Sequence, residues 1–154
     1  MNIEERELKI FFDLPKSFKI QNIKPLKRLV GLYFIFTKDT LIQYPYKKSR
    51  LIYIGMSEKK TNSMSSRLTG HFEGKSKNIG LMNYRKVDSL FFTFIPFEML
   101  RKFWDFSIEN LEAYFIFDFV DKYGVYPICN NKSGFEILGK FVNAKLVIDW
   151  NYFD

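Results

Sequence analysis

The chain has 154 residues, of which 47% are apolar and 19% aromatic, so intrinsic disorder is excluded and one domain spanning residues 1–154 is expected. Lys and Arg outnumber Asp and Glu by 24 to 17, a net charge of +7. This excess indicates a polyanionic partner or an anionic membrane surface, and we expect nucleic acid.

Membrane and secretory classes do not fit the sequence. No apolar run approaches the ~18 residues that span a bilayer, since acidic residues interrupt the most apolar region. The single cysteine, Cys129, cannot form an internal disulfide, and the first residues are charged rather than signal-like. We therefore expect a cytoplasmic protein with no membrane partner.

The positive charge is concentrated in one part of the chain. Residues 46–86 contain ten basic and two acidic side chains, whereas residues 87–131 contain three basic and seven acidic ones. A run of charge is often only a solvated face, but this imbalance favours a phosphate-binding surface. The side chains that we assign to DNA binding are Lys47, Lys48, Arg50, Lys59, Lys60, Lys75 and Lys77.

The first predicted elements are two strands joined by a long loop. Residues 29–36 and 51–55 are short runs of apolar, aromatic and β-branched residues, which is typical of strands. The intervening residues 37–50 are polar and include Pro45, and this segment is long for a hairpin turn. We expect an elaborated loop that presents Tyr44, Tyr46, Lys47 and Lys48.

A helix and a third strand follow. Residues 61–72 carry apolar side chains four positions apart, which predicts a short helix that ends before Gly74. Ser63, Ser65 and Ser66 fit the start of this helix better than a nucleophile. Residues 89–95 predict a buried strand that is stopped by a proline.

Two further helices complete the predicted unit. Residues 97–106 predict a short one, and Ser107 is a suitable N-cap for a longer one that ends at Lys122 or Tyr123, before Gly124. The element order predicts an α+β fold with a small antiparallel sheet flanked by helices. Residues 1–28 and 132–154 are flanking extensions, and the apolar residues 146–150 predict either an extra strand or a partner contact.

Glu112 is the most informative single position. At ~100° per residue, it projects beside Ile108, Phe115 and Phe119 on the predicted long helix. A carboxylate in an apolar stripe is protonated, paired with a cation or bound to a metal, because an isolated buried charge is costly. A structural salt bridge and a metal or acid–base role both remain open.

Other residues suit phosphate chemistry. Arg67 and His71 are four apart on a predicted helix, so a guanidinium and an imidazole share one face, although such a pair is often only a surface Arg and a structural His. Tyr33 and Tyr53 lie within strands, near glycines, and each alone suits a core position. Cys129 suits packing, and a single histidine excludes a Cys/His zinc site.

These residues occur in the order and spacing of a known family. Gly31-Leu32-Tyr33, Tyr53-Ile54-Gly55, Arg67 with His71, Leu111-Glu112 and Pro127-Ile128-Cys129-Asn130 together resemble the GIY-YIG nuclease superfamily. The resemblance covers residues 29–131. It implies a three-stranded antiparallel sheet flanked by helices and phosphodiester cleavage with one divalent metal, Mg²⁺ or Mn²⁺.

The resemblance also implies a role for each matching residue. Glu112 would hold the metal, Arg67 would contact the scissile phosphate, and His71 would assist it. Tyr33 and Tyr53 match the motif tyrosines, one of which helps to deprotonate the attacking water. Asn130 would support the structure of the site.

This sequence departs from the family pattern in three ways. Tyr33 and Tyr53 are 20 positions apart, about twice the usual interval, so the hairpin carries an insertion. Met56 stands where a basic or hydroxylated residue often follows the second motif, which leaves Ser57, Lys59 or Lys60 to supply that contact. Within these 154 residues we also expect no separate DNA-recognition domain.

The sequence therefore predicts a metal-dependent endonuclease that acts on duplex DNA. A non-catalytic nucleic-acid-binding module on the same fold is the alternative, although phosphate binding alone gains nothing from Glu112. A protein-binding scaffold is a third hypothesis, and it predicts no dependence on metal.

Overall fold

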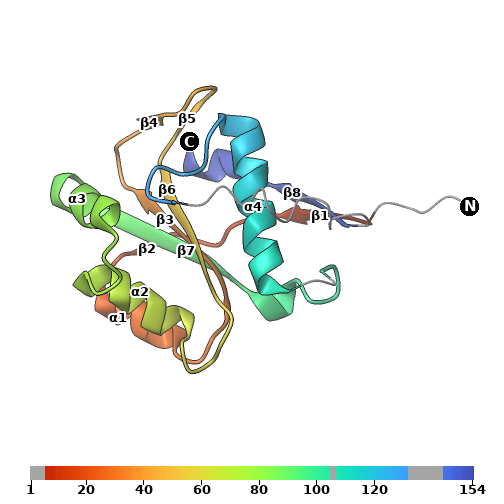
Figure 1. The fold of residues 1–154 in the computed structure, drawn as a ribbon, viewed down its shortest axis with the longest axis horizontal. Helices are drawn as coiled ribbons and strands as arrows, with labels where there is room; N and C mark the ends of the chain where they lie inside the picture. The colour runs from red at the N-terminus through yellow and green to blue at the C-terminus, as the bar shows by residue number, and fades with distance from the viewer. Residues whose placement is uncertain (1–5, 105–106, 132–143) are drawn as a thin grey trace, which may run out of the picture.

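The computed structural model describes residues 6–104, 107–131 and 144–154, and it shows an α+β fold (Figure 1). The helices are α1 (Ile20–Ile23), α2 (Met64–Glu73), α3 (Ile79–Val87) and α4 (Ile108–Tyr123). The strands are β1 (Arg6–Ile10), β2 (Lys16–Ser17), β3 (Gly31–Thr37), β4 (Ile42–Gln43), β5 (Lys48–Ser49), β6 (Leu51–Ser57), β7 (Leu90–Pro96) and β8 (Ala144–Ile148). Short 3₁₀ helices cover Lys24–Leu26, Phe97–Met99 and Trp150–Phe153.

The central sheet has four antiparallel strands in the order β2-β7-β3-β6. The expectation of three strands was wrong, because Lys16 and Ser17 pair with Phe92 and Phe91 and so extend the sheet beyond β7. Strand β3 is central, and all seven of its residues are buried. Strand β6 remains at the edge, next to α4, and it is here that the candidate site forms (Figure 1).

Side chains alternate across β3 and build two apolar clusters. Phe34 and Phe36 belong to the cluster that contains Phe115 and Phe119 of α4. The alternate residues Tyr33 and Ile35 belong to a second cluster with residues of α1, α2 and α3. Figure 1 shows α1, α2 and α3 to one side of the sheet and α4 to the other.

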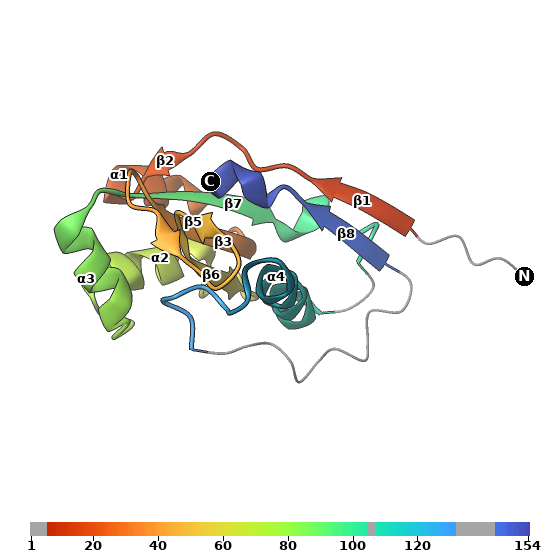
Figure 2. The same cartoon turned by 90° about the horizontal axis from the view of Figure 1, so that it is seen from above.

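The segments outside residues 29–131 pack onto the central unit. Strands β1 and β8 pair in parallel, with Leu8 opposite Leu146. Of the two possibilities for residues 146–150, an extra strand or a partner contact, the structure shows a strand that ends at Ile148. The pair extends away from α2 and α3 (Figure 2). Trp150 and Phe153 are buried against the β3–α4 cluster, so the C-terminal segment contributes to the core.

Two predicted helices are confirmed and one is wrong. Helices α2 and α4 begin after Ser63 and Ser107, whose hydroxyls cap the first turns, and end at glycines with left-handed backbone. The predicted helix at 97–106 is instead a 3₁₀ helix of three residues followed by a turn at 100–103, and residues 105–106 lie outside the described ranges. Helix α3 was not predicted. Among the helices of the described ranges, none is long and apolar enough to cross a membrane.

The long insertion between β3 and β6 folds into a small hairpin of β4 and β5. Tyr46, Lys47 and Lys48 are exposed as expected. Tyr44 is buried instead, because its hydroxyl donates to the Leu51 carbonyl (2.6 Å) and accepts from the Ile128 amide (3.0 Å). The prediction that the loop presents Tyr44 was therefore wrong, and this tyrosine ties the insertion to the core.

Candidate active site

Tyr33 and Tyr53 meet on one face of the sheet. Their ring centroids are 6.1 Å apart. In the β3–β6 register, Tyr33 lies opposite Gly55 and Ile35 lies opposite Tyr53. A Cβ on Gly55 would lie 2.4 to 2.5 Å from three atoms of the Tyr33 side chain, which is too close for any other residue. The glycine therefore makes the space that the Tyr33 ring fills.

A hydrogen-bonded chain runs from the sheet to the loop after α2. The Tyr33 hydroxyl lies 3.1 Å from His71 Nε2, and His71 Nδ1 lies 2.7 Å from Ser76 Oγ. The His71 ring also contacts the Tyr53 ring edge to face, at 5.0 Å between centroids. Both imidazole nitrogens are thus engaged, and the ring orientation is fixed from two sides.

Burial keeps these groups uncharged. It raises the pKa of Tyr33 far above the ordinary value; the neighbouring Tyr53 adds to this rise, and the nearby Arg67 guanidinium opposes it. Burial, followed by the charge of Glu112, raises the pKa of Tyr53. Burial and the cation of Arg67 lower the pKa of His71 to about 4. At neutral pH His71 is therefore a neutral imidazole, with one donor and one acceptor nitrogen.

Arg67 and Glu112 supply opposite charges to the same cluster. Arg67 is half-buried on α2, and although burial lowers its pKa, Tyr33, Tyr53 and Glu112 outweigh that effect and raise it. Glu112 is half-buried on α4, and its charge acts on both tyrosines and on Arg67. Helices on opposite sides of the sheet thus bring a guanidinium and a carboxylate together at the β6 edge.

Asn130 acts on the backbone of β6. Its Oδ1 accepts from the Ile54 amide (2.9 Å) and its Nδ2 donates to the Ile54 carbonyl (2.8 Å). The Cys129 amide also donates to the Ile52 carbonyl (2.8 Å). The side chain of Asn130 therefore replaces a strand partner on the exposed edge and fixes the position of the backbone between Tyr53 and Gly55.

The donor set of the cluster suits a magnesium-type ion better than a zinc-type ion. Within the residues described by the structure, no group of three or more His, Cys, Asp or Glu side chains could enclose a metal. Mg²⁺ commonly binds through one or two carboxylates and keeps several waters, whereas zinc requires a fuller set of protein ligands. Glu112 alone is compatible with the first arrangement.

The basic residues assigned to DNA binding occupy three places. Lys47 and Lys48 lie on the inserted hairpin, Lys59 and Lys60 on the turn before α2, and Lys75 and Lys77 after α2, and all six are exposed. Arg50 differs from them. Its guanidinium donates to the carbonyls of Lys38 and Tyr152, both at 3.2 Å, so it holds the C-terminal segment.

The residues that follow Tyr53-Ile54-Gly55 lie partly in the core and partly in the turn before α2. Met56 packs against the β3–α4 cluster. Ser57 is buried, and its hydroxyl donates to the Asn62 carbonyl, so it is occupied within the turn that precedes α2. Of the three residues expected to supply this contact, only Lys59 and Lys60 are exposed to a partner.

Ser76 is a site residue that the sequence did not indicate. It lies in the loop between α2 and α3, where a serine has no distinguishing spacing, and only the fold brings its hydroxyl to His71. Comparison of the chain with protein-family models, with curated proteins and with solved structures found no match. The site is therefore interpreted from its own geometry and from the motif resemblance.

Proposed function

We propose that the protein is a metal-dependent endonuclease that hydrolyses phosphodiester bonds in DNA, with a site of the GIY-YIG type. The observation that carries the proposal is the packing of Tyr33, Tyr53 and His71 against one another, with His71 hydrogen-bonded to Tyr33. The charges of Arg67 and Glu112 lie near enough to act on both tyrosines. These residues come from β3, β6, α2 and α4. A structural ion pair alone would not require two tyrosines and a neutral histidine beside it.

Arg67 is the residue suited to the phosphate. Its guanidinium is half-buried beside Tyr33 and Tyr53 and remains charged at any working pH. A guanidinium can form two parallel hydrogen bonds to one phosphate group. It would stabilise the negative charge that grows on the phosphorus oxygens during attack, and a partly desolvated position strengthens that effect.

Tyr33 and His71 are suited to moving a proton. A phenol with so high a pKa takes a proton from water only if its own proton has an acceptor. His71 Nε2, at 3.1 Å, can be that acceptor because the imidazole is neutral. The matching tautomer carries its proton on Nδ1 and donates to Ser76 Oγ. Water would transfer a proton to the Tyr33 oxygen as the Tyr33 proton passes to His71 Nε2. Burial and Arg67 disfavour the imidazolium that forms, so it would release that proton again, back through Tyr33, once the phosphodiester bond has broken.

Glu112 is the residue suited to holding a divalent cation. When bound, such an ion lowers the pKa of coordinated water and offsets charge on the phosphate. The carboxylate of Glu112 lies close enough to affect Tyr33, Tyr53 and Arg67 at once. Glu112 would therefore hold such an ion near Tyr33, the proposed base, and near Arg67, which would bind the phosphate.

The test is the incubation of supercoiled plasmid with the wild-type protein in Mg²⁺, in Mn²⁺ and in EDTA. Conversion to nicked or linear DNA with metal, and none with EDTA, is the expected result. DNA binding without cleavage would contradict the proposal and favour a non-catalytic nucleic-acid-binding module. Neither binding nor cleavage would favour the scaffold hypothesis.

A further inference from the structure

Two basic residues hold an uncommon backbone conformation. In the described part of the chain, the non-glycine residues with positive φ are Arg28 (φ 66°) and Lys77 (φ 61°). L-residues adopt this left-handed region rarely, and such outliers tend to occur where the backbone must hold a functional group in place. Both residues are exposed, and neither forms an ion pair with a carboxylate among the residues described.

The turn that carries Arg28 is rigidly attached to α2. Lys27 N donates to the Lys24 carbonyl (3.1 Å), and Leu29 N donates to the Leu26 carbonyl (3.1 Å). The Leu29 carbonyl accepts from Met64 N, the first residue of α2 (2.9 Å). Arg28 is thus fixed beside the beginning of the helix that carries Arg67 and His71.

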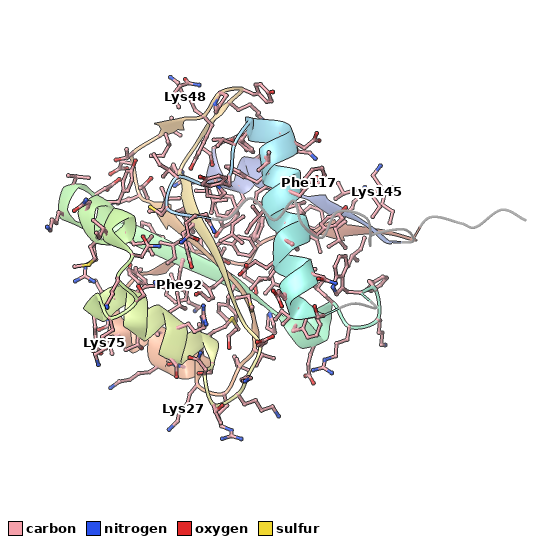
Figure 3. The ribbon with its side chains drawn as sticks, viewed as in Figure 1. Lys27, Lys48, Lys75, Phe92, Phe117 and Lys145 are labelled. Atoms are coloured by element: carbon pink, nitrogen blue, oxygen red, sulfur yellow. The ribbon has the colours of Figure 1, made fainter. Side chains whose placement is uncertain are left out.

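Lys77 lies at the other end of the same helix. Its amide donates to the carbonyl of Gly74, the residue that caps α2 (3.1 Å). Helix α2 has ten residues, a length of about 15 Å. Figure 3 labels Lys27, the residue before Arg28, and Lys75, which lies two residues before Lys77. Both lie on the side of α1 and α2, whereas Lys145 lies on the opposite side of the molecule.

We propose that Arg28 and Lys77 form a clamp that binds the backbone of duplex DNA on both sides of the phosphate held by Arg67. The inference rests on the proposed function for its ligand, and it assigns a binding role to the N-terminal segment. The two side chains are separated by roughly the length of α2, so they would contact different phosphates. Because the backbone of each residue is already held in one conformation, binding costs little backbone freedom and chiefly orders the two side chains.

The test is the affinity of a labelled duplex of about 25 base pairs, measured by fluorescence anisotropy in EDTA, where no cleavage occurs. The variants are Arg28→Gly, Lys77→Gly and the double variant. Glycine adopts the left-handed conformation freely, so each substitution removes the charge and keeps the turn. Lys145→Gln, an exposed lysine on β8, is the control for a general loss of charge.

Each single glycine variant should bind the duplex about 5- to 10-fold more weakly than the wild type near 0.1 M salt. The slope of log affinity against log salt should become shallower by about one in each single variant and by about two in the double variant. The melting temperature of Arg28→Gly should equal or exceed that of the wild type. Wild-type affinity in Arg28→Gly, an equal loss in Lys145→Gln, or no duplex binding by the wild type would overturn the clamp.

The same experiment separates the clamp from the proposed function. Plasmid cleavage by the wild-type protein in Mg²⁺ is measured in parallel. If the wild type binds duplex DNA and cuts none, but Arg28→Gly lowers affinity as expected, the nuclease proposal fails and the clamp stands. If the wild type cuts plasmid and Arg28→Gly binds unchanged, the clamp alone fails.

Discussion

The Tyr33 hydroxyl has two neighbours of different chemical character. The Arg67 guanidinium can only donate a hydrogen bond, whereas the neutral His71 ring can accept one at Nε2. Tyr53 lies nearer the solvent and is only half-buried. Tyr33 is fully buried, but its hydrogen bond to His71 gives its own proton an acceptor. On that ground we propose Tyr33, rather than Tyr53, as the residue that takes the proton from water.

Tyr33→Phe tests this assignment, because it removes only the hydroxyl. Cleavage of plasmid DNA should fall by roughly 10² to 10⁴, the usual contribution of a general base, while folding should lose no more than about 1 to 2 kcal/mol. Tyr53→Phe is the matched control, with a smaller loss and an unchanged pH profile. Near wild-type cleavage by Tyr33→Phe beside an inactive Tyr53→Phe would reverse the two roles.

Position 55 requires glycine because the Tyr33 ring occupies the space of a Cβ, not because the backbone there needs a conformation that only glycine adopts. In Gly55→Ala the new methyl group would overlap that ring, so the free energy of unfolding should fall by about 1 to 3 kcal/mol and cleavage should fall with it. Gly70→Ala in α2 is the control, because no atom lies within 4 Å of its Cβ position. Thermal unfolding should show a gain of about 0.5 to 1 kcal/mol there.

His71 makes stability depend on pH in a definite direction. Its pKa is about 4 when folded, against an ordinary 6.5, so between these values the unfolded chain binds a proton that the folded chain does not. Stability should therefore fall as pH decreases from about 6.5 to about 4. Relative to His71→Gln, the wild type should lose roughly 2 to 3 kcal/mol more in denaturant unfolding across this range. Parallel losses in both proteins would contradict a buried neutral imidazole.

At the scale of elements, the inserted hairpin is a rigid extension rather than a loose loop. Tyr44 fixes its base, and Lys47 lies 5.1 Å from the centre of the Tyr123 ring at the end of α4. Its two exposed lysines therefore have a defined position near the C-terminal end of α4, and we propose that they contact the DNA backbone there.

The double variant Lys47→Gln with Lys48→Gln tests that contact. The slope of log affinity against log salt for duplex DNA should become shallower by up to about two, because two phosphate contacts are lost. The melting temperature should change little, since both side chains are exposed. An unchanged slope would show that the hairpin does not touch the DNA backbone.

The elements that could be predicted were those with strong local signals. Serine caps and terminal glycines defined α2 and α4, and continuous apolar runs defined β3, β6 and β7. Helix α3 buries only Leu81 and exposes Ile79 and Val87, so its apolar pattern did not indicate a helix. Its cap, Asn78, was the signal that could have located it.

At the scale of the whole molecule, the pairing of strands that are distant in the chain could not be predicted from the sequence. Strands β1 and β8 come from opposite ends of the chain, and nothing in either segment specifies the other. The candidate site residues could be predicted more readily than this pairing, because the order of the motifs in the sequence alone indicates Tyr33, Arg67 and Glu112. The contacts of Ser76, and the use of Arg50 to hold the C-terminal segment, depend on distant parts of the chain.

The proposed metal-dependent cleavage requires the Glu112 carboxylate of α4, so the most direct measurement is plasmid cleavage by Glu112→Gln in Mg²⁺ or Mn²⁺. Glu109→Gln is the matched control, since Glu109 is an exposed glutamate on the same helix. We predict no cleavage by Glu112→Gln, with DNA affinity equal to or above that of the wild type because one negative charge near the phosphates is removed, and normal cleavage by Glu109→Gln. Undiminished cleavage by Glu112→Gln in metal-replete buffer would contradict a catalytic metal on Glu112.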